Sequence, residues 1–206
     1  MGNTVGNVSA AAPKIAGAIF RGDVGTKLPT DAVSELDSAM KCLGFISEDG
    51  VTNSNSPSSS DVKAWGNDTV LTTQTERPDT FKFKLIESKN TEVLKTVYGD
   101  SNVKGDLSTG IEVKVTTEDL EEKSYVIDMI LRDKTAKRMV IPRGKIISVA
   151  DITYKGSDVI GYEVTVKASR DAAGASHYEY LKATDNSEQA AVSNSAQQVE
   201  DNTEQQ

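Results

Sequence analysis

The residue types that perform nucleophilic catalysis or bind transition metals are scarce in this sequence. It has one histidine, His177, and one cysteine, Cys42. A hydrolytic triad needs a base beside an activated nucleophile, and no serine motif of that kind occurs. A structural zinc site needs about four Cys or His ligands, more than the chain has. We therefore expect His177 to be structural or at the surface, Cys42 to be a small buried side chain at a helix end, and no metal or cofactor to bind.

Carboxylates are plentiful, but their arrangement is typical of solvated turns. Glu48 and Asp49 are adjacent, as are Glu121 and Glu122, and both pairs are expected in loops rather than in an apolar setting. A glycosidase acid needs an apolar setting that raises its pKa, and a calcium loop needs oxygen ligands at fixed alternating positions. The sequence also contains no glycine-rich phosphate-binding motif. These absences favour binding or assembly over catalysis, so we expect a protein that is not an enzyme.

The acidic balance argues against tight binding of nucleic acid. The chain has 31 acidic and 23 basic residues and a net charge of −8, whereas phosphate binding needs a basic surface. A protein past which nucleic acid slides is compatible with this charge. No segment reaches transmembrane length, and the N-terminus lacks a signal-like pattern. We expect a soluble protein that stays in a cytoplasm until it assembles.

Alternation of apolar and polar residues predicts one mixed but mainly β domain. Phe81, Phe83 and Leu85 alternate with lysines, which predicts a strand with one core face. In the stretch 124–132, apolar residues lie on both faces, so that strand is buried on two sides or meets another subunit. Further strands are expected at 16–21, 111–116, 139–149, 152–154, 160–168 and 177–181.

Two short helices are expected beside these strands. Val33, Leu36, Met40 and Leu43 form one stripe of a 3.6-residue period, so a helix is predicted over 30–43. Thr30 or Asp31 would cap it and Gly44 would end it. A second helix is predicted from Asn90 to Tyr98, with Asn90 as its cap and Gly99 at its end. The first helix should cover one face of a sheet.

The stretch from Gly44 to Leu85 reads as three consecutive strands joined by unequal connections. Two turns are short, at 66–68 and 77–79, whereas Thr52–Ser60 (TNSNSPSSS) is predicted to be a long polar loop. Such a loop is either disordered filler or a surface for a partner. At the ends, we expect a flexible segment at 1–15 and a disordered acidic tail at 183–206, flanking one domain at 16–182.

An ordered set of motifs resembles a known family. The motifs are GTKLPTDA at 25–32, LGFISEDGV at 43–51, KAWG at 63–66, TFKF at 80–83, LIE at 85–87 and the segment 90–99 that ends in VYG. In this order and at these spacings, they are similar to the major tail tube proteins of long, non-contractile-tailed bacteriophages of Gram-positive hosts. The likeness is densest between Leu28 and Val103 and fades toward Leu181.

The resemblance implies a β-sandwich-like domain flanked by a helix. It implies that six copies close into a ring whose inner wall is one continuous β-barrel, and that rings stack into the tail tube of the virion. Its partners would be other copies of itself, a tape measure protein, and tail terminator and distal tail proteins. Phage DNA would pass through without specific binding, and no membrane is involved. The alternative is a β-sandwich binding module, such as a receptor-binding or adhesin-like component.

The resemblance also gives candidate assembly residues. The inter-ring stacking loop would comprise Ser47, Glu48, Asp49, Gly50, Val51, Thr52, Asn53, Ser54, Asn55, Ser56, Pro57, Ser58, Ser59, Ser60, Asp61 and Trp65. Trp65 is either an apolar anchor in this contact or an ordinary core tryptophan. The half-polar pattern of Thr69–Glu76 suits a strand that lines the lumen. The candidate lumen residues are Val70, Thr72, Gln74, Glu112, Lys114 and Thr116.

Overall fold

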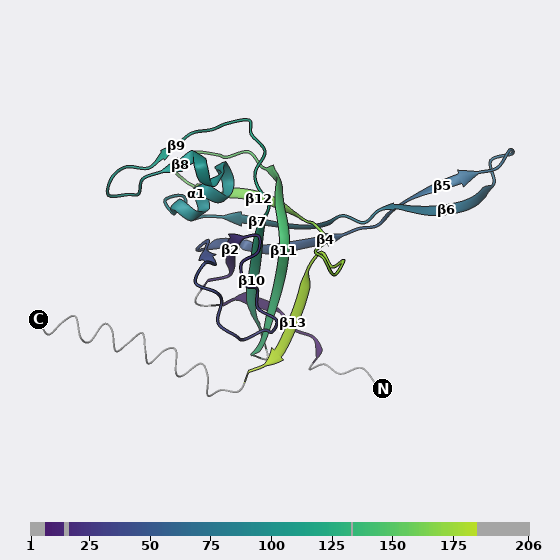
Figure 1. The fold of residues 1–206 in the computed structure, drawn as a ribbon, viewed down its shortest axis with the longest axis horizontal. Coiled ribbons are helices and arrows are strands. Elements are labelled where there is room, and N and C mark those ends of the chain that lie inside the picture. The colour runs from purple at the N-terminus through teal and green to yellow at the C-terminus, as the bar shows by residue number, and fades with distance from the viewer. Residues whose placement is uncertain (1–6, 15–16, 133, 185–206) are drawn as a thin grey trace, which may run out of the picture.

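The computed structural model describes residues 7–14, 17–132 and 134–184, and antiparallel strands dominate it (Figure 1). The main sheet has the order β3–β2–β10–β11–β12–β7–β4. Its strands are β2 (Ile19–Asp23), β3 (Lys41–Cys42), β4 (Ile46–Asn55), β7 (Asp79–Leu85), β10 (Lys123–Leu131), β11 (Thr135–Val149) and β12 (Tyr162–Ala168). β1 (Ala11–Pro13) joins the sheet at β10, and β13 (Tyr178–Ala183) joins it at β11. The expected mainly β fold is confirmed, and the described strands do not close into a barrel.

The long strand β11 holds the two parts of the sheet together. On one side it pairs with β10 along most of its length. On its other side it pairs first with β13, from Thr135 to Val140, and then with β12, from Gly144 to Val149. Side chains from β2, β10 and β11 share one apolar core with those of β7 and β12. The two parts of the sheet are therefore two sides of one core, as in a sandwich.

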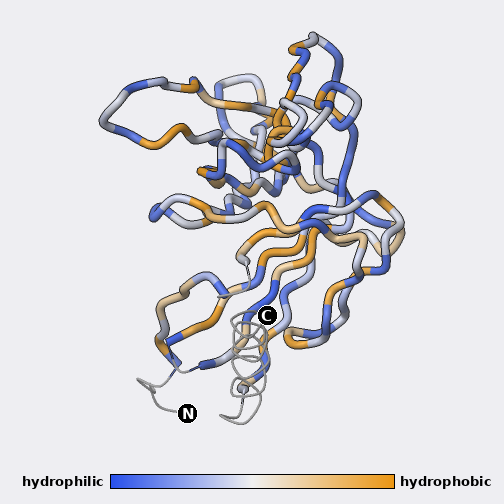
Figure 2. The backbone as a smooth tube through the Cα atoms, turned by 90° about the vertical axis from the view of Figure 1, so that its left-hand side faces the viewer, coloured by the Kyte–Doolittle hydropathy of each residue, from blue (hydrophilic) through white to orange (hydrophobic). Residues whose placement is uncertain are grey.

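The core strands follow the alternation that their sequences predict. Phe81, Phe83 and Leu85 are buried on β7, while Lys82 and Lys84 between them are not. β12 is buried in the same alternating way and pairs with β7 along its length. Figure 2 shows hydrophobic and hydrophilic stretches alternating along the chain through the body of the molecule. The predicted strands at 80–85 and 160–168 are thus confirmed.

One helix, α1 (Thr91–Tyr98), closes the core at the end of the sheet (Figure 1). The Asn90 side chain accepts a hydrogen bond from the Glu92 N–H at 3.0 Å, and Gly99 ends the helix with φ +96°. Val93, Leu94 and Val97 are buried. The N-cap, the C-terminal end and the buried stripe of α1 are therefore at the positions that the sequence predicts. A short 3-10 turn, η2 (Asp100–Asn102), and a small sheet of β8 (Val103–Lys104) and β9 (Glu112–Val113) follow.

Strand β10 is buried on both faces, as its sequence predicts, and its own chain provides the cover. Tyr125 and Ile127 belong to the main core. Val126 faces the other way and packs with Val140 and Met40 in a second cluster. Leu28 and Leu36 also pack against this cluster. No second subunit is needed to bury this face.

The predicted helix over 30–43 is wrong. The segment forms bends and a turn before β3. The Asp31 carboxylate accepts hydrogen bonds from the N–H groups of Val33 and Ser34, which is a cap, but the helix does not propagate. The Arg138 guanidinium donates to the main-chain carbonyls of Asp31 and Ser34 at 3.2 and 2.9 Å, so these carbonyls bond to a side chain from β11. A distant residue overrides the local helical pattern, although Leu36 and Met40 still cover the sheet.

The predicted long loop at Thr52–Ser60 is also wrong. Thr52–Asn55 continues β4 and pairs with β7, and Ser58–Ser60 begins β5 (Ser58–Lys63). β5 pairs with β6 (Thr69–Glu76), so the stretch from Gly44 to Leu85 contains four strands. Only Ser56 and Pro57 separate β4 from β5. Both faces of β5 and β6 are exposed, so their sequences lack the apolar alternation that identifies a half-buried strand. These strands therefore could not be recognised from the sequence pattern.

Smaller differences concern strand lengths and Cys42. The expected strand at 111–116 is reduced to β9, and 152–154 lies outside the strands. Cys42 is a free, half-buried residue on β3 and not at a helix end. Ala11–Pro13, within the segment expected to be flexible, pairs with β10. All but the first two residues of the expected tail at 183–206 lie outside the described residues.

Gly44 supplies a test of the packing around α1. It has φ +71°, and a Cβ there would lie 2.0 Å from the carboxyl carbon of Glu87. That carboxylate accepts from the Phe45 N–H and the Asn90 side chain. We expect Gly44→Ala to cost about 1–2 kcal/mol for the left-handed backbone and about 1–2 kcal/mol more for the displaced hydrogen bonds.

Gly50 is the matched control for this substitution, measured by urea denaturation. Its φ is +68°, and a Cβ there would meet nothing within 4 Å. Gly50→Ala should therefore show the backbone cost alone. Equal losses in the two variants would mean that the Glu87 carboxylate does not stabilise this corner.

Candidate functional site

A two-stranded hairpin projects from the main sheet, and we call it the hairpin arm (residues 56–77). It contains β5, β6 and the turn between them, and it extends away from the side on which α1 lies (Figure 1). Every residue from Thr52 to Arg77 is exposed. A two-stranded hairpin without a covered face is marginally stable alone in water. We therefore expect contact with a partner to stabilise the hairpin arm.

Cross-strand hydrogen bonds and a tight turn define the shape of the hairpin arm. The Thr72 hydroxyl donates to the Asp61 carboxylate at 2.7 Å across the two strands. At the tip, the Ala64 N–H donates to the Asp68 carbonyl at 2.8 Å and the Asn67 N–H to the Ala64 carbonyl at 3.0 Å. Asn67 has φ +76°, a region that asparagine tolerates better than most residues. The arm is thus an ordered hairpin.

The two faces of the hairpin arm differ. Asp61 lies opposite Thr72 and Ser59 opposite Gln74, so these cross-strand pairs are polar. Val62 lies opposite Leu71 on the other face, and both are exposed by more than half. Trp65 in the turn is fully exposed, which rules out a core position for it within this chain. We call Val62, Trp65, Val70 and Leu71 the apolar tip.

The root of the hairpin arm is fixed by a buried carboxylate. Asp79, the first residue of β7, is 2% exposed and accepts hydrogen bonds from Asn53 on β4 at 2.8 Å and from Ser176 at 2.5 Å. Its Oδ2 also lies 2.5 Å from Nδ1 of His177, whose ring packs edge-on against Phe81. Ser176 and His177 both bond to Asp79 and are not bonded to one another in the manner of a triad. His177 therefore has a structural contact here.

The electrostatics of this root predict a pH dependence of stability. Burial alone would raise the pKa of Asp79, but hydrogen bonds from Ser176, Asn53 and His177 outweigh it and lower the pKa below 3.8. A carboxylate with a lowered folded-state pKa stabilises the fold above its unfolded pKa, and that stabilisation is lost as the pH falls. We expect Asp79→Asn to cost about 1–3 kcal/mol at pH 7. Urea titrations measure the difference in free energy of unfolding between Asp79→Asn and the wild type. This difference should become smaller below pH 3.8, and a difference that does not change with pH would contradict the prediction.

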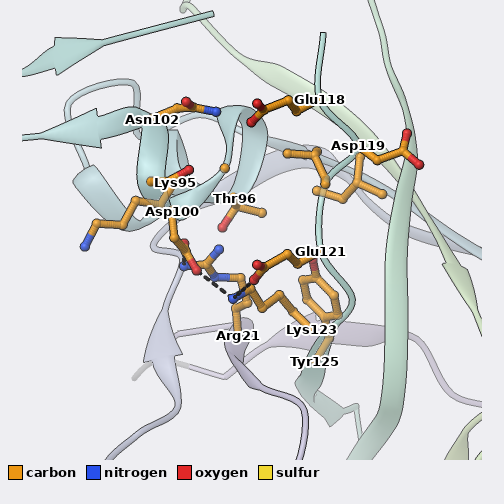
Figure 3. A pocket seen from close by; sticks show the side chains of 14 residues that line it. Arg21, Lys95, Thr96, Asp100, Asn102, Glu118, Asp119, Glu121, Lys123 and Tyr125 are labelled. Atoms are coloured by element: carbon orange, nitrogen blue, oxygen red, sulfur yellow. Dashed lines mark hydrogen bonds and ion pairs between the residues drawn. The ribbon is translucent and has the colours of Figure 1, made fainter. Parts of the chain in front are cut away.

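A charged cavity of about 250 Å³ is lined in part by α1. Figure 3 shows its lining side chains, and Figure 1 shows that α1 and the hairpin arm lie at opposite ends of the molecule. Arg21 is buried in its wall and donates to the Asp100 carboxylate at 2.7 Å. Lys123 contacts Asp100 at 2.7 Å, Asp23 at 2.8 Å and Glu121 at 3.1 Å. Burial alone would raise the pKa of Asp100, but Lys123 and Arg21 lower it. Burial raises the pKa of Tyr125, in the same wall, to about 12.

Open strand edges are the third feature that could bind a partner. In the described part of the chain, β4 pairs only with β7 and β13 only with β11. β5 and β6 pair only with each other. Unpaired edges of this kind bind further strands unless something blocks them. Chemically, these edges and the apolar tip can join protein to protein, and no described cluster of His, Cys, Asp or Glu is placed to hold a metal ion.

The structure joins most of the predicted stacking residues into one continuous ribbon. Ser47–Asn55 lies in β4, Ser58–Asp61 lies in β5, and Trp65 lies in the turn at the end of the arm. Sequence reasoning missed that β6 belongs to the same surface. Val62 and Leu71, on either side of the Gly66–Asp68 turn, were the available signal for this pairing.

The candidate lumen residues fall into two separate groups. Val70, Thr72 and Gln74 lie on β6, in the hairpin arm. Glu112 lies on β9, with Lys114 and Thr116 just after it. β6 and β9 are on opposite sides of the molecule (Figure 1), so one copy of the chain does not bring the two groups together.

Comparison with known proteins agrees with this picture of an assembly protein. A family model described as "Phage tail tube protein" matches residues 4–192. No curated protein matches the chain. None of the helices among the described residues has the length and apolar character needed to span a bilayer.

Proposed function

The chain belongs to the phage tail tube protein family, and from this premise we propose that six copies form a ring and that rings stack through the hairpin arm. The family makes it a structural protein of the virion tail that assembles into a tube with other tail components. The resemblance to phage tail tube proteins is thereby confirmed. That the tail is long and non-contractile remains part of our proposal. The six-fold ring, the stacking contact and a host among Gram-positive bacteria belong to our proposal. We also propose that the protein has no catalytic activity.

The hairpin arm is the observation that carries this proposal. Its backbone edges are unpaired in the described part of the chain, and its apolar tip is exposed to water. Contact with another copy would bury the apolar tip and pair the strand edges. It would therefore remove the exposed apolar surface and the unpaired backbone groups together. A contact between unlike surfaces of identical copies propagates, as tube growth requires.

We also propose that the tube conducts phage DNA without binding it specifically. The net charge of −8 supports this, because a basic lumen would release counterions and hold the duplex. The two candidate lumen groups would come from different copies if they line one channel. Tape measure, tail terminator and distal tail proteins are the further partners in this proposal. The tube domain at 16–182, with extensions at 1–15 and 183–206, is its proposed domain division.

Trp65 provides a direct test, because it contributes nothing to the described core. We expect Trp65→Ala to leave the free energy of unfolding within about 0.5 kcal/mol of the wild type. Assembly should suffer, since truncating a tryptophan anchor raises the critical concentration about tenfold or more. Sedimentation of concentrated wild type and variant measures this. Equal pelleting at all concentrations would contradict an anchoring role.

A further inference from the structure

The cavity under α1 has features of a receptor for a protein side chain. Part of its lining is apolar, from Leu120, Tyr125 and Ile146. Its volume of about 250 Å³ exceeds the roughly 150 Å³ of an engineered cavity that binds benzene. A bicyclic aromatic side chain is the size of group that such a space admits. The cavity is partly open, and residues from 95–102 and 118–125 form most of its lining (Figure 3).

The charges around the cavity leave one carboxylate available. Arg21 and Lys123 are paired with Asp100, and Lys95 is paired with Glu92 at 2.8 Å. Asp119 is paired with Lys145 at 2.9 Å. Glu118 is exposed and makes no ion pair with any described residue. The rim can therefore accept a cation from outside without breaking an existing pair.

The apolar tip of the hairpin arm carries the complementary groups. Trp65 is fully exposed, and Lys63 lies two residues before it. The Lys63 ammonium donates only to the Asn67 side chain, at 3.0 Å. An indole with a nearby ammonium matches a partly apolar cavity with a free carboxylate at its rim.

We propose that this cavity receives the hairpin arm of a second copy, with Trp65 inside it and Lys63 at Glu118. The inference rests on the proposed function and adds the receiving surface to it. The arm and α1, which lines the cavity, lie at opposite ends of one molecule (Figure 1), so the arm of a different copy fills the cavity. The chain's own tail is a poorer occupant. From 185 to 206 it has acidic residues but no lysine, arginine or aromatic residue.

Charge reversal tests the contact between Lys63 and Glu118. We expect Lys63→Glu and Glu118→Lys each to raise the critical concentration for assembly about two- to fivefold. The double variant, which restores opposite charges, should return close to the wild-type value. Glu35→Lys, a reversal at an exposed carboxylate that does not line the cavity, is the control. An unchanged value for Glu118→Lys, or a double variant worse than both singles, would overturn the proposal.

A disulfide trap tests the position of the tip without relying on charge. In a Cys42→Ser background, Ala64→Cys beside Trp65 is combined with Glu118→Cys. A disulfide needs Cα atoms within about 7 Å, so oxidation of assembled protein should give a ladder of linked copies. Ala64→Cys with the exposed Gly156→Cys should give none.

The outcomes distinguish a failure of this inference from a failure of the proposed function. If the wild type assembles into tubes but no ladder forms with Glu118→Cys, the cavity is not the receptor and the tube function stands. If the wild type never assembles, the proposed function fails, and the inference fails with it.

Discussion

A chain in which residues 56–78 are replaced by Asn-Gly should fold normally and form no tubes. Asn55 and Asp79 are opposite one another in the β4–β7 ladder, so a two-residue turn can join them. The removed residues up to Arg77 are all exposed and contribute no side chain to the described core. Assembly would lose the apolar tip and the edges of β5 and β6 together.

Circular dichroism and a urea midpoint close to the wild type should show that the shortened chain folds. Pelleting and electron microscopy should then find no polymer at concentrations where the wild type assembles. Thr73→Ser, which keeps a hydroxyl at an exposed arm position, is the matched control and should assemble normally. Deleting Thr52–Ser60 is a poorer test, because Thr52–Asn55 pairs with β7. Normal tubes from the shortened chain would contradict the role of the hairpin arm.

Arg138→Ala should be the most destabilising single substitution that we predict. Arg138 is 1% exposed and binds both oxygens of the buried Asp128, at 2.6 and 2.8 Å. It also holds the carbonyls of Asp31 and Ser34, and with them the segment that covers the second cluster. Removing one partner of a buried pair costs about 3–5 kcal/mol, a large part of a typical 5–15 kcal/mol stability.

A paired substitution separates the buried charge from the lost contacts. Arg138→Met with Asp128→Leu leaves no buried charge, so it should be more stable than Arg138→Ala alone. Recovery should be incomplete, because methionine cannot donate to the two carbonyls. Urea denaturation of the three chains measures this. A loss below about 1 kcal/mol for Arg138→Ala would contradict the structural role of the pair.

Sequence reasoning succeeded where a local pattern and a buried face coincide. The alternation in β7 and β12 and the cap of α1 were predictable, because each pattern is determined by neighbours in the chain. The helix over 30–43 failed since Arg138, more than a hundred residues away, binds its carbonyls. Its apolar stripe still identified Leu36 and Met40 as covering residues. Burial was easier to predict than backbone form.

The candidate site was less predictable than the core. A strand exposed on both faces has no apolar alternation, so the Ser- and Asn-rich start of β5 looked like a loop. The family resemblance gave the stretch from Ser47 to Trp65 as the candidate stacking segment, but it did not give the conformation of that stretch. The cavity under α1 had no sequence signal at all. Arg21, Asp100 and Lys123 come from three distant segments that only the fold brings together.

Electron microscopy of the concentrated, purified wild-type protein tests the central claim most directly. We predict stacked rings with six-fold symmetry in end views, and density joining successive rings at the position of the hairpin arm. A protein that stays monomeric at every concentration and in the presence of the other tail proteins would contradict the account.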